Sequence, residues 1–273
     1  MHRMYCKHHS YRFVSVRIFL CVIALLCLSQ TFSASAEEQK PRLTYFVITQ
    51  QARPFQMDGE PSDGQGVVSD LVAEVLSKAD IVWKVEALPF RRMIRKMEQT
   101  RDGQWIALGS PAWSGIQSER LSATPVSYAH HVALVSKSVE DASFDIFQLS
   151  QFKSKNAVLL FGFDYPGLDR FLNQHQMTTQ YAKSYDSAFR LVRRDHQHSI
   201  FIEMESRIDY NLKQLNTPKT QFYRIDMSSV IPDYSIHLAY SPGLDEDIVA
   251  LLDAEILRLK ASGQLRNIIA RYQ

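Results

Sequence analysis

Two successive blocks of short strands alternating with amphipathic helices, separated by one long apolar strand, constrain the fold of this chain more than any other feature. In the first block, residues 42–49, 81–87 and 104–108 have the composition of strands, and apolar residues at helical spacing lie between them. The pattern restarts at Asn156 and continues to Tyr240. Such alternation is typical of α/β domains. The sequence therefore predicts two comparable α/β units.

The segments outside these two blocks complete the predicted architecture. Residues 124–138 resemble one long strand, and a strand between two α/β units is a candidate hinge. The tail is helical: its first helix has an apolar stripe and ends before Gly263, which suits the position just after a helix. The stripe consists of Ile248, Leu251, Leu252, Ile256 and Leu259.

The N-terminus has the features of an export signal. Four basic and no acidic residues precede Ile18–Leu28, an apolar run of 11 residues, and a polar stretch then ends in Ala34-Ser35-Ala36. A helix of that length rises only about 16 Å, against roughly 30 Å for the hydrocarbon core of a membrane. We therefore expect residues 1–36 to be a cleaved signal peptide and the protein to be periplasmic.

Removing this leader changes the composition that matters for function. The remaining 237 residues contain no cysteine and carry 27 basic against 29 acidic residues, a net charge of −2. A mature chain without cysteine has neither disulfides nor a thiol nucleophile. A slightly acidic chain is also unsuited to nucleic acid, which requires a basic face. We expect a monomer that binds no nucleic acid.

Motifs for catalysis, metals and cofactors are missing from the sequence. It contains no Gly-x-Ser-x-Gly, no His-Glu-x-x-His and no glycine-rich phosphate loop. His130 and His131 are adjacent on a predicted strand, so they point to opposite faces and do not chelate one ion together. The basic residues of 91–96 fit a solvated helix face. The expectation is a protein that is not an enzyme and has no metal or other cofactor.

Four landmarks in order carry a resemblance to a known family. They are Arg53-Pro54-Phe55 with the later Gly66–Leu71, Glu119-Arg120 with Ala123–Pro125, the strand Ser199–Glu203, and the closing helix Leu252–Leu265. Together they resemble the family-3 extracellular solute-binding proteins of the polar amino-acid type, of which this chain would be a divergent member.

The resemblance implies a two-lobed periplasmic-binding-protein-like (type II) α/β fold, with two lobes joined by two crossing strands. Lobe 1 would comprise residues 37–134 plus 231–273, and lobe 2 residues 135–230. A small polar ligand, amino-acid-like or an organic acid, would bind between the lobes for delivery to an inner-membrane permease or sensor. Inter-lobe clefts also favour small-molecule sites on general grounds.

Two charged residues are the main site candidates that the resemblance implies. Arg120 matches the family's arginine that clamps the ligand carboxylate, a role that suits a planar guanidinium. Glu203, at the end of a lobe 2 strand, would hold an ammonium group, and Glu205 is the alternative. Either glutamate could instead stabilise a helix N-terminus.

Further candidates follow the ends of predicted strands. The aromatic residues Phe55, Trp113 and Tyr165 are candidates for stacking on a ligand, and Gln51 and Ser110 for hydrogen bonding to it. Aromatic residues are also common in cores, so each has a purely structural alternative.

Several departures from the family pattern concern the ligand rather than the fold. Ala52 replaces an aromatic residue before Arg53-Pro54-Phe55, residues 111–116 are extra, and 163–167 replace the usual helix start of lobe 2. Two alternatives to transport therefore remain. One is a sensor or scaffold, and the other a dehydratase on the same fold, with Glu203 or Glu205 as general acid opposite Arg120.

Overall fold

The computed structural model describes residues 42–57, 65–137 and 152–273 of the chain. The predicted signal peptide, residues 1–36, lies outside these ranges. No helix within them is long and apolar enough to cross a membrane.

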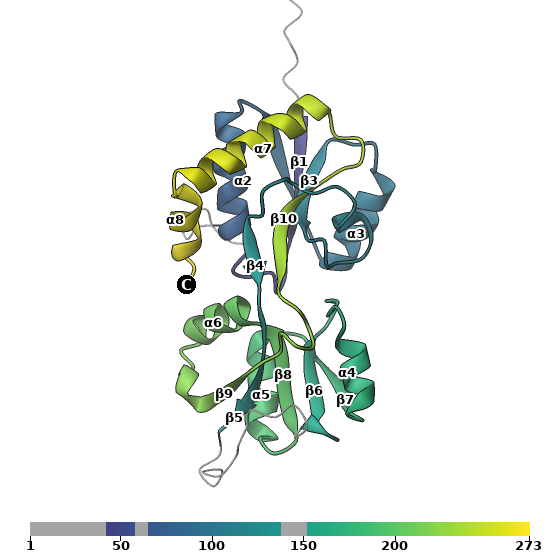
Figure 1. The fold of residues 1–273 in the computed structure, drawn as a ribbon, viewed down its shortest axis with the longest axis vertical. Helices are drawn as coiled ribbons and strands as arrows, with labels where there is room; N and C mark the ends of the chain where they lie inside the picture. The colour runs from purple at the N-terminus through teal and green to yellow at the C-terminus, as the bar shows by residue number, and fades with distance from the viewer. Residues whose placement is uncertain (1–41, 58–64, 138–151) are drawn as a thin grey trace, which may run out of the picture. The chain divides into compact units, whose positions relative to one another are not determined.

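Sheet 1 contains five strands in the order β2-β1-β3-β10-β4 (Figure 1). The strands are β1 (Arg42–Ile48), β2 (Val82–Leu88), β3 (Trp105–Gly109), β4 (Ser127–Ala129) and β10 (Tyr234–Tyr240). β1 runs parallel to β2 and β3, whereas β10 is antiparallel to β3 and β4. The antiparallel strand β10 thus returns to sheet 1 from the distal part of the chain.

Helices cover both faces of sheet 1. They are α2 (Val67–Lys78), α3 (Phe90–Gln99), α7 (Glu246–Ala261) and α8 (Gln264–Ala270). Tyr45 and Val47 of β1 belong to the cluster that contains the buried residues of α2, α7 and α8, and the alternate residues Phe46 and Ile48 pack with Met93 of α3. Both faces of β1 are therefore buried, because side chains of a strand alternate between the faces of its sheet.

Sheet 2 has the strand order β7-β6-β8-β5-β9, and helices pack on both of its faces. Its elements are β5 (His131–Ser136), β6 (Asn156–Leu160), β7 (Thr178–Ala182), β8 (Ser199–Met204), β9 (Phe222–Asp226), α4 (Leu168–Gln174), α5 (Tyr185–Arg194) and α6 (Glu205–Gln214). Short 3₁₀ turns occur at Gly115–Gln117 and Lys219–Gln221. α5 and α6 cluster with Val158 and Phe201, and α4 with Leu159 and Ile200 on the other face.

The chain passes between the two sheets twice. β4 pairs with β10 in sheet 1 and β5 pairs with β8 and β9 in sheet 2, so the segment expected as one strand over 124–138 is two strands that separate at His130. The carbonyl of His130 accepts a hydrogen bond from the Glu205 N–H, and its Nδ1 lies 2.9 Å from Asp233 Oδ1. The second passage runs from β9 to β10. The expected two-lobed α/β fold is confirmed.

The C-terminus is fixed to the beginning of α2 by Tyr272. Its hydroxyl donates to Asp70 Oδ2 at 2.6 Å and accepts the Gly66 N–H at 3.1 Å. Gly66 has φ 99°, and a Cβ there would lie 2.6 Å from the Phe55 carbonyl oxygen. Tyr272 therefore holds a tight turn in which the backbone leaves no room for a larger residue.

We expect Tyr272→Phe to lower the free energy of unfolding by about 1–3 kcal/mol, because it leaves the buried Gly66 N–H without its acceptor and Asp70 Oδ2 with Arg271 as its remaining partner. Chemical denaturation measures the difference. Tyr128→Phe is the control, since Tyr128 is 65% exposed and its loss should change little. Equal stability of the two variants would contradict this role for Tyr272.

Candidate functional site

A cavity of about 320 Å³ lies at the carboxyl ends of strands from both sheets. This is the edge at which open α/β sheets bind ligands. Its lining from sheet 1 and the segments after its strands includes Ile48, Phe90, Arg91, Trp113 and Gln117. Its lining from sheet 2 includes His131, Phe163, Tyr165, Glu203 and Arg207. The size suits a small molecule.

Two opposite charges are buried in the wall of the cavity. Glu203 is the penultimate residue of the buried strand β8, and Arg207 lies in the first turn of α6, which follows without a loop. Their exposed fractions are 1% and 2%, and Arg207 Nη1 lies 3.5 Å from Glu203 Oε1. Burial raises the pKa of Glu203 above its usual range, and the charge of Arg207 opposes that rise.

Glu203 receives its hydrogen bonds from other groups. Its Oε1 accepts the Met204 N–H at 2.8 Å, and its Oε2 accepts the Tyr165 hydroxyl at 3.1 Å. Burial, followed by the nearby Glu203 charge, raises the pKa of Tyr165 well above 10, so the phenol stays protonated as a donor. Glu203 is thus held by two donors besides Arg207.

Aromatic rings cover the guanidinium of Arg207. Its central carbon lies 4.8 Å from the centre of the Phe163 ring and 5.6 Å from that of Phe55, within cation–π range. Phe163 in turn stacks on Phe90 with ring centres 5.5 Å apart. Neither ring supplies an oxygen or nitrogen acceptor, so the N–H groups of Arg207 depend on other acceptors.

His131, at the start of β5, adds a neutral polar group to the cavity. It is 1% exposed, its ring contacts Tyr165 and Tyr234, and its Nδ1 has no hydrogen-bond partner in the described part of the chain. Burial and then the charge of Arg207 lower the pKa of His131 to about 4. The imidazole is therefore uncharged at neutral pH.

Three residues predicted from the sequence line this cavity: Trp113, Tyr165 and Glu203. The Trp113 Nε1–H donates to the Tyr234 hydroxyl at 3.2 Å, which orients its ring. The hydroxyl of Tyr165 is already engaged by Glu203 and by the Leu160 N–H, at 2.9 Å. The structure thus brings these three together.

Three other predicted residues lie behind the lining. Phe55 is buried and supports Arg207 through its ring. The Ser110 hydroxyl donates to the Ser235 carbonyl at 2.8 Å and accepts the Ala112 N–H at 3.2 Å, so it shapes the loop that carries Trp113. Gln51 has φ 65° and a buried Oε1 without a hydrogen-bond partner among the described residues. None of the three lines the cavity.

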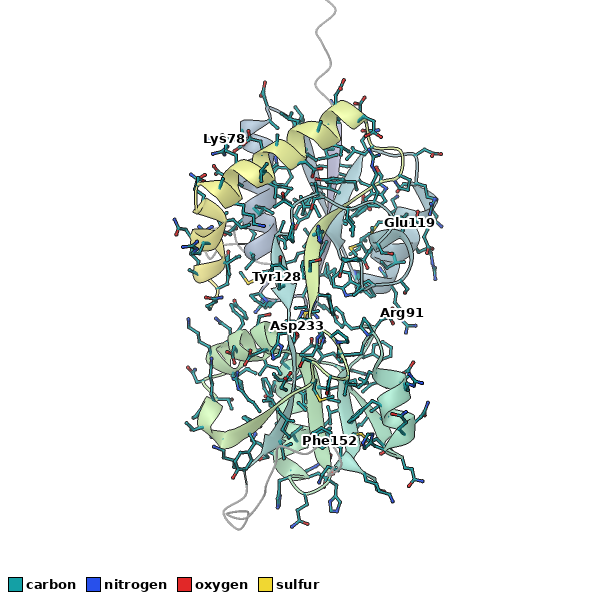
Figure 2. All side chains as sticks on the ribbon, in the orientation of Figure 1. Lys78, Arg91, Glu119, Tyr128, Phe152 and Asp233 are labelled. Carbon is teal, nitrogen blue, oxygen red and sulfur yellow. The ribbon has the colours of Figure 1, made fainter. Side chains whose placement is uncertain are left out.

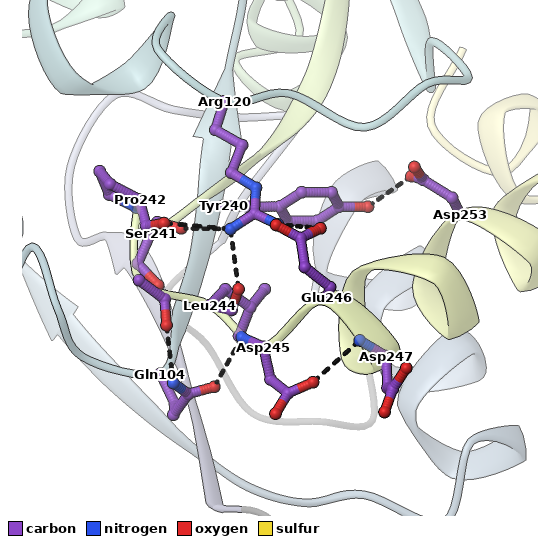
Figure 3. Close-up of polar contacts among 11 residues, drawn as sticks. Gln104, Arg120, Tyr240, Ser241, Pro242, Leu244, Asp245, Glu246, Asp247 and Asp253 are labelled. Atoms are coloured by element: carbon purple, nitrogen blue, oxygen red, sulfur yellow. Dashed lines mark hydrogen bonds and ion pairs between the residues drawn. The ribbon is translucent and has the colours of Figure 1, made fainter.

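Arg120 lies elsewhere, against the loop between β10 and α7 (Figure 3). Its Nη1 donates to the carbonyl oxygens of Leu244 at 2.7 Å and Pro242 at 3.1 Å, and its Nη2 lies 2.7 Å from the Glu246 carboxylate. Arg120, which we predicted to bind the ligand, does not line the cavity, and its guanidinium is bound to this loop.

Strand register explains the position of Arg120. The Arg120 carbonyl accepts the Tyr240 N–H at the end of β10, whereas Tyr234 at its beginning contacts the cavity residues His131 and Trp113. Six residues of strand separate these two ends, roughly 20 Å at about 3.3 Å per residue. The segment after β3 lines the cavity with Trp113, Ser114, Gly115 and Gln117, and not with Arg120.

Glu205, the alternative to Glu203, has a structural partner. Its carboxylate lies 2.9 Å from Nη1 of Arg224, which also binds Asp209. The cavity lining includes Glu203 and not Glu205.

Sequence reasoning missed Arg207, His131, Gln117, Phe90 and Phe163, and assigned Arg91 to a solvated face. Arg91, labelled in Figure 2, is exposed and also lines the cavity, with its guanidinium carbon 5.6 Å from the Phe161 ring centre. A signal for Arg207 was present, since it follows Glu203 by four residues across a strand end and a helix start. Within the described residues, no group of three or more His, Cys, Asp or Glu side chains is placed to hold a metal ion.

Comparisons with known proteins find the same fold at low sequence identity. No protein-family model and no curated protein matches the sequence. The substrate-binding protein of an amino acid ABC transporter is 12% identical with a TM-score of 0.62, and the match covers 85% of this chain and 98% of that one. A structure from work on glutathione import via GshT and the cystine ABC importer TcyBC of Streptococcus mutans is 15% identical with a TM-score of 0.64. The match covers 85% of this chain and 95% of that one.

A sensory protein has the same architecture. A histidine kinase sensor domain with similarity to periplasmic binding proteins is 14% identical with a TM-score of 0.61, and the match covers 86% of this chain and 96% of that one. This chain therefore has the two-lobed fold of ligand-binding proteins, found in both transport and sensing.

Replacing Arg120 tests its structural position. We expect Arg120→Met to lower the free energy of unfolding by about 1–3 kcal/mol, because several buried carbonyl groups and Glu246 lose a charged donor. Chemical denaturation measures this. Arg101→Met is the control, since Arg101 makes a solvent-exposed pair with Glu119 and its removal should cost no measurable stability. Unchanged stability of Arg120→Met would contradict the assignment.

The depressed pKa of His131 predicts a pH dependence of folding. A folded-state pKa near 4 lies below the unfolded value of about 6.5, so protons bind the unfolded chain more tightly. The stabilising contribution is complete above pH 6.5 and is lost as the pH falls towards 4, by roughly 3 kcal/mol in all. Unfolding of the wild type and His131→Asn between pH 7 and pH 4 measures it; identical pH profiles would refute the prediction.

Proposed function

We propose that this chain is an exported binding protein, a divergent member of the family-3 solute-binding proteins, which captures a small molecule in the cavity lined by both sheets. The observation that carries the proposal is the cavity itself. It lies at the carboxyl ends of strands from two sheets and combines aromatic walls with buried polar groups. The N-terminal signal predicted for residues 1–36 would take the protein to the periplasm.

Ligand binding between two sheets linked by two chain crossings provides a means of signalling occupancy. A ligand that contacts residues of both sheets stabilises the arrangement in which both contacts are made, by the difference in its affinity for the two states. A permease in the inner membrane then recognises the occupied form. Similarity in fold to an ABC-transporter binding protein supports delivery to a transporter.

Sensing without transport is the second candidate, supported by the similarity to a histidine kinase sensor domain. In this case the occupied protein contacts a membrane sensor. A dehydratase of the kind considered above would need Arg120 opposite Glu203 or Glu205. Arg120 is instead bound to the loop after β10, so this pairing is not present in the structure.

A thermal-shift screen of the exported protein tests for ligand binding. We expect at least one compound from a library of amino acids, short peptides, polyamines and organic acids to raise the melting temperature. At about 100 times its dissociation constant, a ligand adds roughly 2.7 kcal/mol of stability. The Trp113→Ala variant should lose most of this stabilisation, since Trp113 forms part of the cavity wall.

Tyr128→Ala is the matched control, because Tyr128 is an exposed aromatic residue outside the cavity lining and should leave the shift unchanged. A ligand that stabilises Trp113→Ala as strongly as the wild type would show that binding occurs elsewhere. A screen without any stabilising compound would count against a binding protein altogether.

A further inference from the structure

The hydrogen-bonding capacity of Arg207 is largely unused. A guanidinium carries five N–H donors, and buried donors in proteins are almost always paired. Arg207 Nε is buried without a hydrogen-bond partner in the described part of the chain, and the ion pair to Glu203 spans 3.5 Å, at the limit of a hydrogen bond. The buried Tyr185 hydroxyl also has no hydrogen-bond partner among these residues.

A role for Arg207 as the counterion of Glu203 does not explain why Arg207 Nε lacks a hydrogen-bond partner among the described residues. A guanidinium that serves as counterion typically forms short, often bidentate contacts of about 2.7–2.9 Å with its carboxylate. Here the two oxygens of Glu203 accept instead from the Met204 N–H and the Tyr165 hydroxyl. Glu203 is therefore bound by two neutral donors, while Arg207 Nε has no hydrogen-bond partner among the described residues.

The surroundings of Arg207 determine what kind of group it accepts. The ring centres of Phe163 and Phe55 lie 4.8 Å and 5.6 Å from its central carbon and offer no oxygen or nitrogen acceptor, so its N–H groups are the donors left for an incoming acceptor. A planar, doubly accepting oxyanion fits these N–H groups best. Arg207 lines the cavity together with Trp113 and Phe90, whose rings suit the apolar body of a small molecule.

We propose that Arg207 is the anion-binding residue of the cavity, and that the ligand is a small carboxylic acid whose carboxylate lies in the plane of this guanidinium. This inference rests on the proposed function as a binding protein and names its ligand class. The carboxylate is then recognised from α6 of sheet 2, and not by Arg120 beside sheet 1. The unpartnered Nδ1 of His131 provides a neutral hydrogen-bonding position in the same cavity.

Calorimetric titration with matched acids and amides tests the ligand class. The full chain is expressed for export and the protein is purified from the periplasm. It is then titrated with the screening library and with the pairs benzoate and benzamide, indole-3-acetate and indole-3-acetamide, and succinate and succinamide. We expect a carboxylate to bind, and its amide to bind at least about tenfold more weakly because it loses the charge-assisted bonds.

Variants of the charge pair assign this binding to Arg207. Arg207→Met should weaken carboxylate binding at least about tenfold. Because a lone buried Glu203 destabilises the fold, the double variant Glu203→Gln/Arg207→Met, which removes both charges, serves as the folded reference and should show the same loss. Glu203→Gln alone should tighten binding by about threefold or more, because a competing negative charge is gone. Arg120→Met should leave the dissociation constant unchanged.

The proposal is supported if Glu203→Gln tightens carboxylate binding, Arg207→Met weakens it, and Arg120→Met leaves the dissociation constant unchanged. Binding only of amides, amines or other uncharged compounds, or carboxylate binding that the double variant retains, overturns it while the binding function stands. Loss of carboxylate binding in Arg120→Met would restore the arginine expected from the family resemblance and also overturn it. If no compound binds, the proposed function fails together with this inference.

Discussion

A guanidinium buried among aromatic rings dominates the physical chemistry of the cavity. A buried charge requires partners, because its desolvation costs several kcal/mol and each unpaired donor adds to that cost. Arg207 has one carboxylate at 3.5 Å, two rings within cation–π range and an Nε without a partner among the described residues. The low pKa of His131 and the raised pKa of Glu203 both reflect this desolvated environment. The carboxylate binding that we propose for the site follows from the same imbalance.

The fold determines which charges reach this place. β8 ends at Met204 and α6 begins at Glu205, so Glu203 and Arg207 are held on rigid elements on either side of one junction. In sheet 1, the segment after β3 runs antiparallel to β10, which takes Arg120 to the end of β10 away from Tyr234. There Arg120 binds loop carbonyl groups and Glu246. The segment after β3 thus contributes Arg120 to the loop between β10 and α7 and Gln117 to the cavity lining.

The sequence predicted the fold better than the site. Apolar periodicity identified α2, α3 and α7, because their buried faces must repeat at helical spacing, and strand-like runs between helices identified the strands of both sheets. It joined β4 and β5 into one strand because both are apolar, and only pairing with different neighbours separates them at His130. Of the predicted residues that line the cavity, Trp113 and Tyr165 were chosen because they follow predicted strands, and Glu203 because the family resemblance places an acid at the end of its strand. The position of Arg120 outside the cavity lining was not predictable, because a motif gives the residue type and not the register. Arg207 was missed because its place in the lining depends on contacts with Glu203, Phe55 and Phe163.

A crystal structure of the exported protein with a carboxylate that binds it tests the central claim most directly. The account predicts the carboxylate within hydrogen-bonding distance of Arg207, in the plane of the guanidinium and between the rings that line the cavity. Arg120 would retain its bonds to the carbonyl groups of Pro242 and Leu244. A carboxylate bound to Arg120, or one in the cavity without contact to Arg207, would contradict the account.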